Sequence, residues 1–73
     1  MILPTKHIQT KRSLIGAGAE ILSLIDKPYN VSTLWYKARI LPEIRTFEFF
    51  VITLDFLFVL GAVEFEKGFI NKK

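Results

Sequence analysis

The residues that could carry out chemistry are few and lie far apart in the sequence. His7 is the only histidine and cysteine is absent, so no cluster of metal-ligating side chains is predicted. Ser13 and Ser32 stand where helices should begin, and we expect helix caps rather than nucleophiles. The segment "GAGAE", residues 16–20, lacks the third glycine of a dinucleotide loop and lies inside an expected helix. We therefore expect no enzymatic activity, no cofactor and no metal site.

Basic residues are the next candidates, because the chain carries a net charge of +3. They are scattered and form no run of four, so the composition permits nucleic-acid binding without demanding it. The side chains that would contact phosphates in a nucleic-acid-binding protein are Lys6, Lys11, Arg12, Lys37, Arg39 and Lys72.

The most informative segment is "TFEFFVITLDFLFVLGAVEF", residues 46–65, which is rich in phenylalanine and contains no lysine or arginine. Residues 47–63 only just reach the length of a membrane span, and Asp55 near the middle would cost about 2.5–3.5 kcal/mol on insertion. Glu20 interrupts the earlier apolar run, which argues against a signal peptide. We expect a cytoplasmic protein without a membrane span.

A DNA-reading role fits the position of this segment better than its chemistry. In a helix-turn-helix, the helix after the turn enters the major groove and presents polar or basic side chains. Here the outward positions hold Glu48 and Asp55, with Ile52, Val59 and Ala62 on the same side. Carboxylates facing phosphates would be repelled, so DNA binding remains the alternative rather than the main hypothesis.

A protein-binding role agrees with the pattern of the whole segment. A helix over residues 47–60 would turn a wide apolar side toward the core, formed with the following glycine by Phe47, Phe50, Val51, Leu54, Leu57, Phe58 and Gly61. A second apolar side is predicted to bind a partner through Phe49, Ile52, Phe56 and Leu60. Two alternatives stay open: the first helix and an N-terminal strand cover this side, or it forms a homodimer.

The surrounding elements predict a small winged helix-turn-helix-like domain, mainly α with a small β part, over residues 1–73. A short edge strand is expected at residues 6–9, and helices are expected at residues 14–26, 33–41 and 47–60, the last capped by Thr46 and ended by Gly61. Alternation of Val63 and Phe65 with glutamates then predicts a hairpin wing that turns at Lys67 and Gly68. A domain of this size is marginally stable alone, and its apolar content suggests a partner.

The order and spacing of several segments resemble a known bacterial family. These are "LPTKHI", "SLIGAGAEIL", "VSTLW" and the long segment at 46–65, followed by the hairpin. Together they resemble the sixth type of middle component of the ABC-three-component systems, over roughly residues 3–70. The resemblance implies an adaptor that works beside an SMC-like ABC ATPase of the chromosome-maintenance and repair type and a separate effector subunit, in conflict with phages or plasmids. It implies no catalytic residues.

Overall fold

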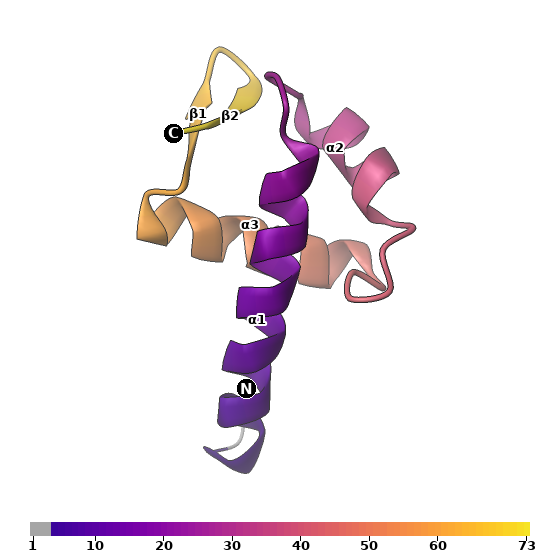
Figure 1. Ribbon diagram of the computed structural model, residues 1–73, viewed down its shortest axis with the longest axis vertical. Coiled ribbons are helices and arrows are strands. Elements are labelled where there is room, and N and C mark those ends of the chain that lie inside the picture. The colour runs from indigo at the N-terminus through magenta and orange to yellow at the C-terminus, as the bar shows by residue number, and fades with distance from the viewer. Residues whose placement is uncertain (1–3) are drawn as a thin grey trace.

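Three helices precede a two-stranded hairpin (Figure 1) in the computed structural model, which describes the backbone of residues 4–73 and the side chains of residues 13–73. The elements are α1 (Pro4–Leu24), α2 (Val31–Ala38), α3 (Phe47–Leu60), β1 (Val63–Glu66) and β2 (Phe69–Lys72). This arrangement confirms the predicted fold class, a mainly helical, winged-helix-like domain with a C-terminal hairpin.

The prediction of an N-terminal edge strand at residues 6–9 is wrong, because α1 begins at Pro4 and includes these residues. Proline is well tolerated in the first turn of a helix, where its missing N–H has no intrahelical partner to lose. Ser13 therefore lies inside α1 and does not cap it. In Figure 1 the N-terminal half of α1 extends past α3, whereas its C-terminal half lies among the other elements.

Helix α2 begins two residues earlier than predicted, because Asn30 rather than Ser32 is its cap. The Asn30 side-chain oxygen accepts a hydrogen bond of 2.8 Å from the Thr33 backbone N–H, which satisfies an amide that the first helical turn leaves free. The helix ends at Ala38, and Pro42 follows after a tight turn. Proline disfavours helical backbone in the residue before it.

Helix α3 has the predicted bounds and both predicted ends. Thr46 Oγ1 accepts a hydrogen bond of 3.1 Å from the Phe49 backbone N–H. Gly61 adopts a left-handed conformation with φ +77° at the C-terminal end, where its N–H reaches the carbonyls of Leu57 and Phe58.

The wing is an antiparallel hairpin that turns at Lys67 and Gly68, as predicted. Both residues have positive φ, +54° and +84°, as a tight hairpin turn of this kind requires. Beside β2, Tyr29 forms a single antiparallel bridge with Ile70, and each donates its backbone N–H to the carbonyl of the other, at 3.2 and 2.6 Å. The third strand of the wing is therefore one residue long and comes from the α1–α2 connection, where the N-terminal segment was expected.

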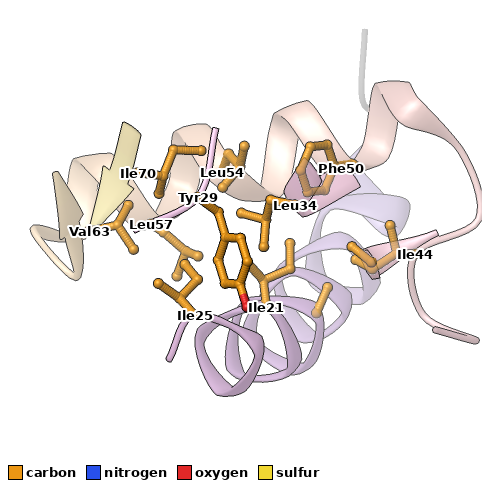
Figure 2. Close-up of a cluster of buried hydrophobic side chains, with 12 residues drawn as sticks. Ile21, Ile25, Tyr29, Leu34, Ile44, Phe50, Leu54, Leu57, Val63 and Ile70 are labelled. Atoms are coloured by element: carbon orange, nitrogen blue, oxygen red, sulfur yellow. The ribbon is translucent and has the colours of Figure 1, made fainter. Parts of the chain in front are cut away.

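The core lies where the C-terminal half of α1, helices α2 and α3 and the wing meet (Figure 2). Its largest fully buried side chains are Phe50, Ile21, Leu34, Ile44, Ile70 and Thr53. Thr53 is the one polar member of this set, and its hydroxyl is satisfied by donating a 2.8 Å hydrogen bond to the Phe49 carbonyl. Four positions on the side of α3 expected to face the core are less buried: Val51 and Phe58 lie half-buried, and Phe47 and Gly61 are exposed.

Close contact between α1 and α3 depends on a glycine. A Cβ atom on Gly18 would lie 3.1 Å from Cδ2 of Leu57 and 3.8 Å from the Phe56 ring. Gly18 and its neighbour Ala17 are both buried. Gly18 thus allows α1 and α3 to pack closely, which explains its presence despite a cost of about 1 kcal/mol in a helix.

Candidate protein-docking surface on helix α3

One side of α3 is anchored in the core, and the opposite side is open to solvent. The anchored side consists of Phe50, Thr53, Leu54 and Leu57. The open side consists of Glu48, Ile52, Asp55 and Val59, all exposed, and is called the outer stripe below. Positions separated by three or four residues share one side of a helix, so these four side chains form a continuous strip along α3.

The four residues predicted to bind a partner divide into two groups. Ile52 and Leu60 are exposed, at 44% and 62% of their surface. Phe49 and Phe56 are half-buried and pack against the core, and Phe56 also lies beside Gly18 of α1. Helix α1 therefore covers part of this side, as one of the alternatives supposed, and the two phenylalanines border the exposed strip rather than forming its centre.

Val59 is the exposed apolar residue that the predicted partner-binding set omits. Its side chain is 85% exposed, the most of any large apolar residue described. It lies two helical turns from Ile52 on the same side of α3. That spacing is visible in the sequence. On the sequence alone, Val59 is placed with Glu48 and Asp55 on a possible DNA-reading side, and for that reason it is missing from the predicted partner-binding set.

The outer stripe and strand β1 of the wing are negatively charged, in contrast with the rest of the chain. Residues 46–66 contain four carboxylates, at Glu48, Asp55, Glu64 and Glu66, and no lysine or arginine. This segment contributes −4, so the net charge of +3 leaves +7 on all other residues. All four carboxylates belong to exposed residues. The outer stripe, where Glu48 and Asp55 alternate with Ile52 and Val59, is suited to a partner that offers both apolar and basic side chains.

The sequence matches the family model of the ABC-three component (ABC-3C) system Middle Component 6 over residues 3–72. The chain belongs to this family. No curated protein and no solved structure matches the sequence. The match confirms the family resemblance found in the sequence, and it covers both the outer stripe and the wing of this middle component.

The basic residues proposed for nucleic-acid contact are not gathered on α3 of the middle component. Lys37 and Arg39 belong to the α2 region, where the Lys37 Nζ atom lies 5.4 Å from the centre of the Tyr29 ring and the Arg39 guanidinium lies 4.4 Å from that of Tyr36. Lys72 is exposed at the end of β2. The side chains of Lys6, Lys11 and Arg12 lie outside the described residues.

A shallow hollow of about 320 Å³ separates the end of α1 from β2 and is lined by Ile25, Asp26, Lys27, Pro28, Asn71 and Lys72. Its carboxylate is already engaged, because the Tyr29 hydroxyl donates a 2.8 Å hydrogen bond to Asp26 Oδ1. This bond lowers the pKa of Asp26 and raises the pKa of Tyr29. The pair ties the α1–α2 connection together and offers no acid–base chemistry.

A second exposed apolar area lies where α2 meets the start of α3. The rings of Trp35 and Phe47 meet edge to face with centres 5.4 Å apart, and Phe50 lies beneath both. Phe47 is predicted to lie in the core, but it is the first residue of α3 and its side chain is 49% exposed.

Between residues 4 and 73, no helix of the middle component combines the length and the apolarity that crossing a bilayer requires.

Proposed function

We propose that this middle component is a cytoplasmic, non-enzymatic adaptor that links an SMC-like ABC ATPase to an effector subunit, in a bacterial system directed against phages or plasmids. The single observation that supports a protein-binding role is the outer stripe of α3. At the position where a DNA-reading helix would present basic and amide side chains, this helix presents two carboxylates and two apolar residues.

The physical chemistry of this surface favours a protein over a nucleic acid. Affinity for DNA comes largely from lysine and arginine on phosphates, and residues 46–66 contain neither. Burying exposed apolar side chains against a partner lowers the free energy of the complex, whether the partner is charged or not. The docking residues that we propose are Phe49, Ile52, Phe56 and Leu60, with Val59 added because it is the most exposed of the apolar side chains.

The direct test is co-purification of the full chain with the ATPase and effector encoded beside it. We expect a complex that survives high salt, because apolar contacts are not screened. The variant Ile52→Asp combined with Leu60→Asp should lose that complex. Ile40→Asp is the matched control, since Ile40 is 79% exposed and lies beyond the end of α2, and it should retain binding. A wild-type chain that binds neither protein would refute the adaptor.

The alternative, a winged-helix DNA-binding protein, predicts a different result. The chain alone would then bind duplex DNA, with an affinity that falls steeply as salt rises. Replacing Lys37 and Arg39 together with glutamate would weaken that binding. Tight DNA binding with this salt dependence, together with no protein partner, would favour the alternative.

A further inference from the structure

The spacing of the outer stripe is that of a helix-pairing surface. Its residues, at 48, 52, 55 and 59, follow one another at intervals of four, three and four. These are the intervals of the a and d positions of a heptad repeat, with the β-branched Ile52 and Val59 at a and the carboxylates Glu48 and Asp55 at d. The positions opposite this surface, f in the heptad, are Phe50 and Leu57, both buried in the core.

The residues on both sides of the outer stripe fit the same geometry. The e positions are Phe49 and Phe56, and the g positions are Val51 and Phe58. All four are half-buried and apolar, so they form shoulders that a second helix would cover further. A single helix laid along α3 would thereby remove apolar surface from water on both sides of the stripe.

Pairing of the outer stripe with a second copy of itself is unfavourable in either direction. In a parallel pair, equivalent d positions meet, so Glu48 would face Glu48 and Asp55 would face Asp55. In an antiparallel pair, a positions meet d positions, and a carboxylate would be buried against Ile52 or Val59 without a partner. Like charges in contact and unpaired buried charges both cost free energy. The occupant must therefore be a helix other than a second copy of α3.

We propose that one amphipathic helix of a partner protein lies along the outer stripe in coiled-coil fashion. This inference rests on the proposed adaptor function and specifies its partner segment. The helix carries lysine or arginine opposite Glu48 and Asp55, and apolar side chains opposite Ile52 and Val59. It needs about 11 residues, or roughly 16 Å of helix, to cover the stripe. Its charged pairs set the register, as charges do between paired helices.

The register can be read with a photo-crosslinking amino acid placed at position 52 or at position 59 of the full chain, in complex with its ATPase and effector. We expect both positions to capture one segment of one partner, at sites about seven residues apart. Lysine or arginine should occur at the intervening heptad position. Capture of two unrelated segments, of a second copy of this chain, or of nothing while the complex stays intact would overturn the proposal.

Charge reversal tests the chemistry of the same contact. Glu48→Lys combined with Asp55→Lys should weaken binding of the partner by about 10-fold or more, because like charges would then meet. Glu43→Lys combined with Glu66→Lys changes the net charge equally at exposed carboxylates away from the stripe, and it should have much less effect. Thermal melting of both variants checks that each is folded.

These outcomes separate the partner helix from the adaptor function itself. A wild-type chain that binds no partner overturns both proposals. A wild-type chain that binds its partner, with the two charge-reversed variants binding equally well, overturns only the helix along the outer stripe.

Discussion

At the scale of single residues, α3 shows how two apolar side chains of one helix take opposite roles. Leu54 is 5% exposed and lies in the core, whereas Val59 is 85% exposed. Both are branched aliphatic residues of one helix. Their difference in burial, rather than in chemistry, decides which contributes to folding and which is available to a partner.

Truncation of these two residues should separate stability from binding. Leu54→Ala should lower the free energy of unfolding by about 2–5 kcal/mol, because it leaves a cavity in the core. Val59→Ala should change it by no more than about 0.5 kcal/mol, as is usual at exposed sites. Chemical denaturation of the isolated chain measures both. Equal losses would mean that the side of α3 assigned to the core is wrong.

Tyr29 and Asp26 give the molecule a predictable response to pH. The Tyr29–Asp26 hydrogen bond raises the pKa of Tyr29, so its stabilisation is complete below the ordinary tyrosine range and is lost as the pH rises through the folded pKa. The same bond lowers the pKa of Asp26, so the stabilisation is also lost in acid, as the pH falls through that lowered pKa.

Tyr29→Phe should therefore melt at a lower temperature than the wild type near neutral pH. The difference in Tm should narrow in strong acid and again in strong alkali, where the wild type also loses the hydrogen bond that the variant lacks at every pH. Tyr36→Phe, at an exposed tyrosine, is the control and should follow the wild type. A difference that is the same at every pH would exclude this hydrogen bond as its cause.

At the scale of elements, the sequence predicted best where local chemistry marks an end. Thr46 and Gly61 mark the two ends of α3, and Lys67 with Gly68 marks the turn of the wing. The sequence predicted secondary structure worst where it depends on contacts with residues far away in the chain. Residues 6–9 could form a strand only if a sheet edge were free to pair with them. Tyr29 already pairs with Ile70 at the edge of β2.

Two candidate caps before α2 can be distinguished by mutation. Asn30→Ala should destabilise the protein by about 1 kcal/mol, because the first turn loses its side-chain acceptor. Ser32→Ala should have little effect, since Ser32 lies within the helix and is exposed. Thermal melting compares the two. A larger loss at Ser32 would restore it as the cap.

The turn of the wing provides the second test at this scale. Gly68→Val should cost about 1 kcal/mol or more, because a β-branched residue is strained at φ +84°. Lys67→Asn should be neutral or stabilising, since asparagine accepts positive φ more readily and is favoured in such turns. Amide hydrogen exchange of β1 and β2 locates the effect, and an unchanged hairpin in Gly68→Val would contradict it.

At the scale of the whole molecule, the general site could be predicted from the sequence but its centre could not. Apolar periodicity identified α3 as a helix with more apolar surface than a small core can hide. It could not show that α1 covers part of Phe56, or that Val59 stands free, because both depend on how α1 crosses α3. The burial of Thr53 could not be predicted for the same reason.

The exposed apolar surface should be detectable in the isolated chain. We expect a hydrophobic fluorescent dye to bind the folded protein, since Ile52, Val59 and Leu60 lie within one helix. Replacing these three with serine should reduce the fluorescence, while far-ultraviolet circular dichroism confirms that the helices remain. Undiminished dye binding would locate the main apolar surface elsewhere, with the Trp35–Phe47 area as the next candidate.

The single bridge between Tyr29 and Ile70 also has a consequence for folding kinetics. It joins residues far apart in the chain, so forming it closes a long loop at an entropic cost, whereas each helix and the hairpin turn form through local contacts. We expect the wing to dock late in folding, because its core residues Val63 and Ile70 reach their buried positions only when that loop closes.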